Sequence, residues 1–254
     1  MTKRQQYIEY VKNGGKRFCS PQIGCGAGFD SRLSGKEWIS ETTFEETIAV
    51  TERFDMLPLY NTGMPDASLC DPTLAFKLVE ERNSDTERYS RFEFTCPKGT
   101  LTREQVEHKR SGVTPVSAAI KDEDDLEAFE WFLDGALQAD LTPITEFIRN
   151  MSNLVGDRGP LSMQWGAQPY ELFSWPDTVT TMFLANDCPE TFTRLMDKIV
   201  ELDSKYMDCC VKGGADFIFL GTPAAEIISP RYFEEFIVPY SKIVTQEAHN
   251  KGLL

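Results

Sequence analysis

Apolar residues recur every three or four positions in several segments of this chain, and that spacing is typical of a helix with one buried face. The longest of these segments follows Asp187 and has its apolar residues at Phe192, Leu195, Met196, Ile199, Leu202 and Tyr206. Asp187, with Glu190 three positions later, predicts a capping box at the start of this helix. Gly213 and Gly214 predict its end.

The same spacing predicts further helices, at residues 3–13, 43–53, 121–137 and 142–154 and from Ser229 onward. Thr142 is expected to be the N-cap of its helix, because Pro143 then falls in the first turn, where a missing N–H is tolerated. Pro239 lies inside the last helix, so a kink is expected there.

Short apolar runs bounded by turn residues predict strands between these helices. They occupy residues 54–60, 161–167 and 217–220, and the first run ends at a turn signal, residues 61–63. Helices that alternate with short buried strands indicate a parallel sheet. The periodicity does not decide between an open sheet and a closed barrel.

Residues 89–102 alternate weakly and break at a turn signal, residues 97–99, which predicts a β-hairpin beside the sheet. Residues 17–35 are rich in cysteine and glycine and predict a loop. Neither a repeat nor a linker divides the sequence, so residues 1–254 are interpreted as a single domain.

The formal net charge of -14 makes nucleic acid an unexpected partner, because phosphate binding needs clustered lysine and arginine. The seven cysteines follow a polar first segment that does not resemble a secretory leader. We therefore expect reduced thiols and a cytoplasmic protein. No apolar run approaches the roughly 20 residues that a membrane-spanning helix needs.

Few residue groups in the sequence suggest a metal site. Cys209 and Cys210 are adjacent on a predicted helix, so their side chains point about 100° apart, and core packing is favoured over chelation. Cys19 and Cys25 flank a glycine-rich loop with no nearby histidine, which favours loop structure over metal binding. The two histidines of the chain are interpreted as solvated surface residues.

Several motifs resemble those of the uroporphyrinogen-decarboxylase-like superfamily. Residues 159–172 are similar to its P-L-I-G-F-x-G-A-P-x-x-L strand and loop, and residues 228–240 to its L-S-P-x-x-F-x-x-F-x-x-P-Y helix. Between them, residues 189–195 match its P-E-x-x-x-x-L helix and residues 213–220 its G-A-D strand. Four motifs in the right order make the resemblance specific.

The front half resembles one branch of that superfamily. Residues 96–102 are similar to the T-P-x-G-T-L-T hairpin of its methyltransferase-like members, and residues 120–126 to their I-K-D-x-x-D-L segment. The resemblance implies an α/β fold, a (β/α)8 TIM barrel with its site at the carboxyl ends of the strands. Residues 217–220 would be roughly the fifth strand of that barrel and residues 253–254 the start of the next. The resemblance thus predicts a barrel that is truncated after about five strand–helix units.

The residues of the decarboxylase branch are largely replaced. Its R-Q-A-G-R loop corresponds to residues 22–30, which contain no arginine, and its F-S-D aspartate corresponds to Asn61. Its A-S-Y tyrosine falls near residues 173–175, and its F-D-S-W strand end becomes residues 219–222. These differences make tetrapyrrole decarboxylation an unfavoured activity.

The other branch resembles corrinoid-dependent methyltransferases and O-demethylases, which bind zinc through a late H-x-C motif and a further cysteine. In this chain those ligands are expected only C-terminal to Leu254. The resemblance implies methyl transfer between a small methylated substrate and a corrinoid held by a partner protein, with zinc assistance. Porphyrinogen decarboxylation and a catalytically inactive or fragmentary binding module are the alternatives. The protein is also expected to be a possible homo-oligomer.

Candidate substrate-binding residues follow from position alone, because strand ends carry the sites of barrel enzymes. They are Asn61, Gln164, Trp165, Tyr170, Thr222 and Glu226. For any one of them, loop capping or packing is an equally good interpretation.

Overall fold

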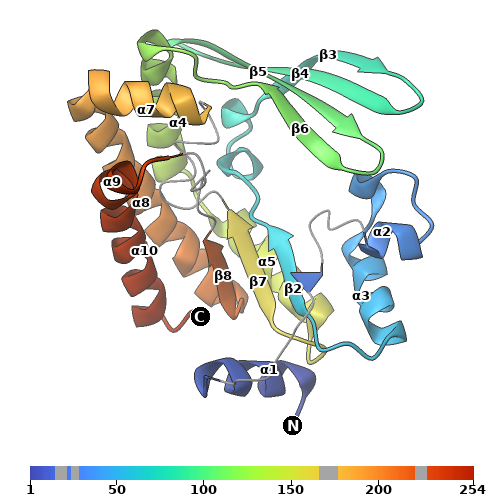
Figure 1. Ribbon diagram of the computed structural model, residues 1–254. Coiled ribbons are helices and arrows are strands. Elements are labelled where there is room, and N and C mark those ends of the chain that lie inside the picture. The colour runs from blue at the N-terminus through green and yellow to red at the C-terminus, as the bar shows by residue number, and fades with distance from the viewer. Residues whose placement is uncertain (15–21, 24–28, 166–176, 221–227) are drawn as a thin grey trace.

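The computed structural model describes residues 1–14, 22–23, 29–165, 177–220 and 228–254. These ranges form an α/β fold with two sheets, one parallel and one antiparallel (Figure 1). The α/β part of the predicted fold class is thereby confirmed. The described parallel strands form an open sheet, and they do not close into a barrel. Within the same ranges, no helix is long and apolar enough to cross a membrane.

The parallel sheet has four strands in the order β1-β2-β7-β8, and these are Gln22–Ile23, Leu59–Gly63, Leu161–Trp165 and Phe217–Leu220. The backbone of Leu254 continues the sheet beyond β8. Its N–H donates to the carbonyl of Asp216 at 3.0 Å, and its carbonyl accepts from the N–H of Ile218 at 3.1 Å. This alternation is the hydrogen-bond pattern of parallel pairing, so the Leu254 backbone pairs with the edge of the sheet at β8.

The first predicted strand was displaced by several residues. β2 begins at Leu59, and the expected turn residues 61–63 lie inside it, paired with β7 in parallel register. Asp55 has a positive φ of 47°, which turns the chain soon after the preceding helix. The polar residues of β2 stay in the strand because β7 satisfies their backbone groups.

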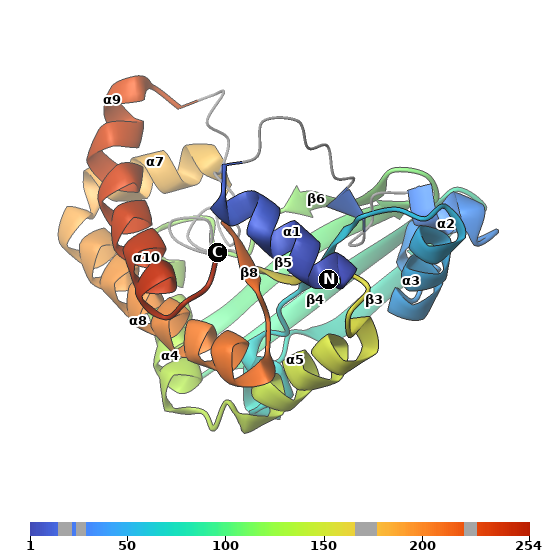
Figure 2. The same cartoon turned by 90° about the horizontal axis from the view of Figure 1, so that it is seen from below.

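The described helices cover the sheet and its ends. They are α1 (Lys3–Lys12), α2 (Phe29–Leu33), α3 (Phe44–Arg53), α4 (Leu126–Gln138), α5 (Thr142–Val155), α7 (Thr178–Asp187), α8 (Pro189–Gly213), α9 (Pro230–Tyr232) and α10 (Val238–Asn250). Short 3₁₀ turns, including η1 (Ile39–Glu41), connect some of them. Helix α2 and strand β1 lie in the segment that was predicted to be loop. Figures 1 and 2 place α1 across the amino ends of the parallel strands.

The helices differ from the predictions at several points, and α4, for example, begins at Leu126 and not at Lys121. Leu141 is the N-cap of α5, while the Asp140 carboxylate accepts a hydrogen bond from the Thr142 N–H at 3.0 Å. Asp187 does not cap α8, because it is the last residue of α7, a helix that the apolar pattern did not indicate. The irregularity expected at Pro239 is a π-helical segment, Phe233–Ile237, which ends just before that proline.

Packing between α5 and α8 depends on a glycine. A Cβ atom on Gly213 would lie 2.5 Å from Cγ2 of Ile148 and 3.2 Å from the carbonyl oxygen of Thr145. Ile148 is fully buried, so the two helix backbones approach more closely than a larger residue allows. Leu161 and Met163 of β7 are buried in the same core.

The antiparallel sheet lies beyond the carboxyl ends of the parallel strands (Figure 1). Its strands, in the order β3-β4-β5-β6, are Lys77–Asn83, Glu87–Cys96, Gly99–His108 and Gly112–Ser117. The predicted hairpin is confirmed as β4 and β5. One face of it carries the paired residues Phe94 and Leu101, both buried, and the Phe94 ring meets Phe132 of α4 at 5.7 Å. The outer strands β3 and β6 were not predicted, because they are mostly polar and exposed.

Candidate functional site

Two side-chain amides meet near the carboxyl ends of β2 and β7. Nδ2 of Asn61 donates to Oε1 of Gln164 at 2.6 Å. Asn61 is 1% exposed, whereas Gln164 is half-buried. The contact joins residues that are 103 positions apart in the sequence, and both belong to the predicted set.

Strand alternation explains why both amides lie on one face. Asn61 pairs in register with Ser162, and Gly63 pairs with Gln164, so these residues point to the same side of the sheet. The intervening residues point to the opposite side, where Met163 is buried in the core with the helices. The face away from those helices is therefore lined by amide and hydroxyl groups near the strand ends.

Aromatic residues of β8 extend this polar face. Phe219 pairs with Gln164 and is 38% exposed, and Phe217 pairs with Ser162. At the amino end of the sheet, the ring of Tyr7 from α1 packs edge-on against Phe217 at 5.8 Å. Helix α1 thus packs on the lower part of the face, where Phe217 is half-buried, whereas Phe219 is exposed nearer the carboxyl ends.

The amino edge of the sheet is held by a network of hydrogen bonds around Asp216. Oδ1 of Asp216 accepts from Nε and Nη2 of Arg4 at 3.1 and 2.9 Å, and its Oδ2 accepts from the Leu161 N–H at 3.0 Å. The carboxylate therefore ties α1 to both β7 and β8. In barrel-like folds, polar groups at this end serve stability.

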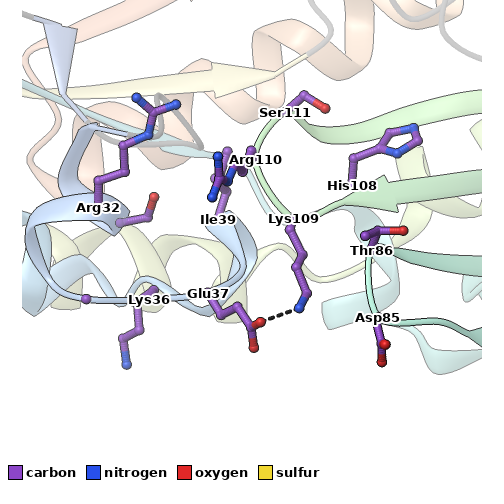
Figure 3. A pocket seen from close by; sticks show the side chains of 12 residues that line it. Arg32, Lys36, Glu37, Ile39, Asp85, Thr86, His108, Lys109, Arg110 and Ser111 are labelled. Atoms are coloured by element: carbon purple, nitrogen blue, oxygen red, sulfur yellow. Dashed lines mark hydrogen bonds and ion pairs between the residues drawn. The ribbon is translucent and has the colours of Figure 1, made fainter.

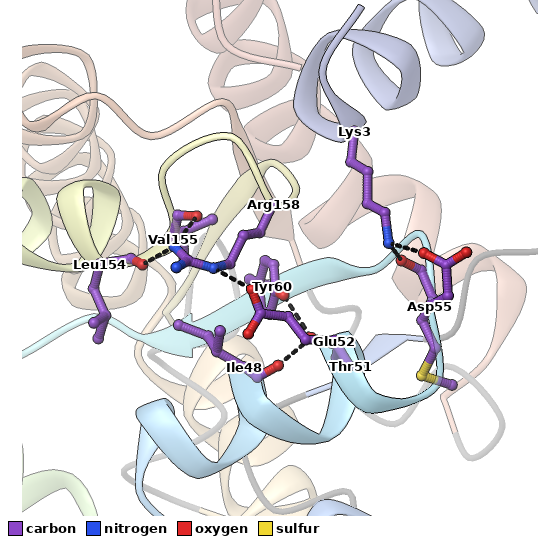
Figure 4. A network of polar contacts seen from close by, with 10 residues as sticks. Lys3, Ile48, Thr51, Glu52, Asp55, Tyr60, Leu154, Val155 and Arg158 are labelled. Atoms are coloured by element: carbon purple, nitrogen blue, oxygen red, sulfur yellow. Dashed lines mark hydrogen bonds and ion pairs between the residues drawn. The ribbon is translucent and has the colours of Figure 1, made fainter.

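A second structural network anchors β2 on its helix side (Figure 4). The Tyr60 hydroxyl lies 2.5 Å from Oγ1 of Thr51, which also donates to the Ile48 carbonyl. Burial raises the pKa of Tyr60. Beside it, Nε of Arg158 donates to Oε1 of Glu52 at 2.6 Å. These groups fix β2 against α3, and with it the position of Asn61.

The antiparallel sheet contributes a charged pair that the sequence interpretation missed. Arg88 and Glu107 face each other across β4 and β5, with Nη1 and Oε2 3.6 Å apart. The Glu107 side chain is 12% exposed, and its Oε1 has no hydrogen-bond partner among the described residues. Strand alternation places both residues on the face of Phe94 and Leu101, and this alternation is the sequence signal for the pair.

The remaining predicted site residues are only partly placed. Trp165 is the last residue of β7 and pairs with Leu220, and only its backbone is described. Tyr170, Thr222 and Glu226 lie outside the described residues. The structure thus brings Asn61 and Gln164 together, and the roles of all six in substrate binding stay predictions.

The cysteines of α8 pack in the core, as predicted. Cys209 is 5% exposed and Cys210 is fully buried, and burial raises the pKa of both thiols. A raised pKa opposes the thiolate form that binds zinc. Across the described ranges, no three His, Cys, Asp or Glu side chains converge on a point where a metal could bind. Cys19 and Cys25 fall outside those ranges.

Comparison with known proteins connects this arrangement to a family. Curated uroporphyrinogen decarboxylases of Geotalea daltonii and Geobacter metallireducens are each 24% identical over 112 residues, which is 41% of this chain and 33% of each relative. The matched region thus spans only a third of the length of these relatives. A solved methyltransferase from Methanosarcina mazei aligns with a TM-score of 0.57 at 14% identity, over 100% of this chain and 68% of its own. That likeness shows a shared fold.

The family model described as uroporphyrinogen decarboxylase (URO-D) matches residues 105–253. This region contains α4, α5, β7, α8, β8 and α10, so it covers the core helices and two of the strands that carry the polar face. Because the match spans more than half of the chain, the protein belongs to the uroporphyrinogen decarboxylase (URO-D) family.

Proposed function

We propose that this chain acts as a methyltransferase-type member of the URO-D family and binds a small methylated substrate at the carboxyl ends of β2 and β7. The observation that carries the proposal is the amide pair of Asn61 and Gln164. The resemblance puts Asn61 where the decarboxylase branch has an aspartate. An amide has no charge to offer a pyrrole nitrogen, but it can donate to and accept from a neutral ether, alcohol or amine.

The surroundings of the pair suit a small, weakly polar ligand. Phe219 supplies an exposed aromatic surface on the same face, next to Gln164 in register. Small-molecule sites combine such apolar surface with a few placed polar groups. We propose that Trp165, Tyr170, Thr222 and Glu226 complete the binding site.

Zinc does not fit the described residues, because their acidic, cysteine and histidine side chains form no cluster and the α8 thiols are buried. The H-x-C ligands implied by the resemblance would lie C-terminal to Leu254. Zinc bound there would polarise the atom that carries the methyl group. The proposal for the described residues is therefore restricted to binding and orienting the substrate, with the corrinoid on a partner protein.

We also propose that the parallel sheet is an arc of a (β/α)8 barrel. Its strands follow one another in chain order, its core helices pack on one face, and Leu254 adds a parallel position beyond β8. The methyltransferase alignment covers all of this chain and 68% of that protein, which is consistent with an arc shorter than the full barrel. A cytoplasmic location follows as part of the same proposal.

Substrate binding can be tested without the metal. Calorimetric titration of the protein with a panel of methyl ethers, methyl thioethers and methylamines should identify one class that binds. Gln164→Met keeps the length of the side chain and removes its hydrogen bonds, so it should weaken binding of that class by about tenfold, the effect of about 1.4 kcal/mol. Asn153→Ala, at an exposed position on α5, is the control and should bind as the wild type does.

Two results would reject the proposal. One is unchanged affinity in Gln164→Met for the class that binds, with a native circular dichroism spectrum. The other is formation of coproporphyrinogen from uroporphyrinogen by the wild-type protein. Methylcobalamin formation from cob(I)alamin and the bound donor, on addition of zinc, would extend the proposal from binding to transfer.

Decarboxylation remains the second candidate because the curated relatives carry that name. It would require a carboxylate near the tetrapyrrole in place of the uncharged Asn61 amide. Glu107 is the candidate for this carboxylate, because it is partly buried and one of its oxygens has no described hydrogen-bond partner. Loss of coproporphyrinogen formation in Glu107→Gln would favour this alternative.

A further inference from the structure

A cleft with a cationic end lies between α2 and the tips of two hairpins of the antiparallel sheet (Figure 3). One wall is the segment from Ser31 to Ile39. The other wall combines the β3–β4 turn, at Asp85, with the β5–β6 turn, at Arg110. None of these residues belongs to the strand-end site, so the cleft raises a separate question of function.

A buried tryptophan fixes the distance between the two walls. Trp38 is 5% exposed, and the guanidinium of Arg88 lies over its ring at 3.8 Å, with Nζ of Lys109 at 5.4 Å. Nη2 of Arg88 also donates to Oε1 of Glu41 at 2.9 Å. Cation–π contacts of this kind are strongest when the ring is desolvated, so they hold the two walls of the cleft in a preorganised arrangement.

Each wall is also rigid by itself. In α2, the buried Asp30 accepts from Oγ1 of Thr47 at 2.6 Å, which ties the helix to α3. In the β5–β6 turn, His108 pairs with Gly112, whose φ is +80°, so a three-residue turn presents Arg110 at its tip. The Lys109 N–H donates to the Thr86 carbonyl at 3.3 Å and joins the two hairpin tips.

The charges of the cleft are distributed unevenly. Lys36 is paired with Glu46 at 3.0 Å, and Lys109 is paired with Glu37. His108 contacts Glu87 at 3.3 Å.

Arg32 and Arg110, by contrast, form no ion pair or side-chain hydrogen bond with any part of the chain that the structure describes. In Figure 3, Arg32 and Arg110 lie on the same side of the view, above the pair of Glu37 and Lys109, while Asp85 lies on the other side. An accessible positive charge is thus concentrated at one point of a protein whose formal net charge is -14.

We propose that the arginine end of this cleft is a binding site for a multiply charged small anion, either a phosphate ester or a polycarboxylate. Guanidinium groups bind both through paired N–H donors in a fixed fork. Two of them on opposite, rigid walls can bind one anion between them, and the Ser111 hydroxyl can donate a further hydrogen bond. The negative charge of the rest of the protein repels an anion, so a bound anion is expected at this positively charged point.

Pyrophosphate and citrate distinguish the two sources of the anion. Each is titrated calorimetrically into the wild-type protein and into Arg32→Gln, Arg110→Gln and Arg231→Gln. Arg231 is a 91% exposed arginine on α9, away from the cleft, and is the matched control. The two cleft variants should each weaken binding about tenfold, the loss expected for one charge-assisted pair, and the control should leave it unchanged.

A fourth variant tests the polarity of the cleft without removing any contact to the anion. Asp85→Asn removes the negative charge at the far end, so it should strengthen binding, and raising the salt concentration should reduce that gain. Tighter binding of pyrophosphate assigns the site to phosphate esters, and tighter binding of citrate assigns it to polycarboxylates. The proposal is overturned if neither anion binds, or if Arg231→Gln weakens binding as much as the cleft variants do. Because no strand-end residue is changed, either result is independent of the proposed substrate site.

Discussion

The ion pair between α4 and α8 gives the sharpest quantitative prediction. Glu130 of α4 accepts from Nε and Nη2 of Arg194 at 2.9 Å each, a two-bond contact, and Nζ of Lys198 lies 2.8 Å from its Oε1. The hydrogen bonds from Arg194, with the charge of Lys198, lower the pKa of Glu130 from 4.5 to about 2. The carboxylate is thus stabilised in the folded state relative to the unfolded chain.

The size of the effect follows from this difference. Each pKa unit corresponds to about 1.4 kcal/mol, so an unscreened estimate is about 3.4 kcal/mol. The Arg194 side chain is 50% exposed, and solvent screening reduces the contribution to about 1–2 kcal/mol. The folded-state pKa is the lower one, so the stabilisation is complete above the unfolded pKa near 4.5. It is lost as the pH falls towards 2.

Urea unfolding, followed by circular dichroism from pH 7 to about pH 3, measures this contribution directly. Glu130→Gln should lower the free energy of unfolding by about 1–2 kcal/mol at pH 7, and its difference from the wild type should narrow steadily below about pH 4.5. Glu127→Gln is the matched control on the same helix, because the Glu127 side chain is 70% exposed and its ion pair is with the half-exposed Lys98. Equal stability of Glu130→Gln and wild type at pH 7, or a difference that persists unchanged at pH 3, would refute the reasoning.

Three further predictions concern the core and the sheet. Gly213→Ala should lower the free energy of unfolding by about 1–3 kcal/mol in urea titrations, because the new Cβ overlaps Ile148. Gly63→Ala is the control and should change the free energy of unfolding little, because its Cβ meets no described atom within 4 Å. Asp216→Asn should lower the free energy of unfolding by about 1–3 kcal/mol in the same titrations. The substitution weakens the contact with Arg4 of α1 and turns a donor towards the Leu161 N–H of β7, so a variant as stable as the wild type would contradict the prediction. Burial raises the pKa of the Cys210 thiol, so a thiol reagent should label Cys210 only in the unfolded protein. Peptide mass spectrometry measures the labelling, and rapid labelling of Cys210 in the native protein would disprove the prediction.

The sequence pattern predicted most of the helices because their buried faces are long and periodic. Helix α8 illustrates this, with Leu195, Met196 and Ile199 fully buried as expected. Its start was misplaced because Asp187 and Glu190 form a good capping pattern by themselves. The pattern could not reveal that Asp187 already ends α7, which presents two of its apolar residues, Val179 and Phe183, to solvent.

The strands were harder to predict, and the reason is non-local pairing. Residues 61–63 look like a turn, yet they form the end of β2 because β7, about a hundred residues later, supplies their partners. Strands β3 and β6 lack an apolar pattern and depend on hydrogen bonds to β4 and β5.

The candidate sites show the same dependence on tertiary structure. Asn61 and Gln164 could be proposed one at a time from their positions at strand ends, but their contact could not be deduced. Arg32 and Arg110 could not be distinguished from the other basic residues in the sequence, because the ion pairs of Lys36 and Lys109 become visible only in the structure. Periodicity reveals burial, whereas a binding site depends on which exposed groups meet.

The separation of β2 and β7 along the chain has a kinetic consequence. The whole antiparallel sheet, α4 and α5 lie between them, so their pairing closes a loop of about a hundred residues. The strands β4 and β5 meet through a turn of two residues and close at far lower entropic cost. Local contacts of this kind form early, and distant parallel pairing follows late. On this argument the amide pair is expected to form later in folding than the β4–β5 hairpin.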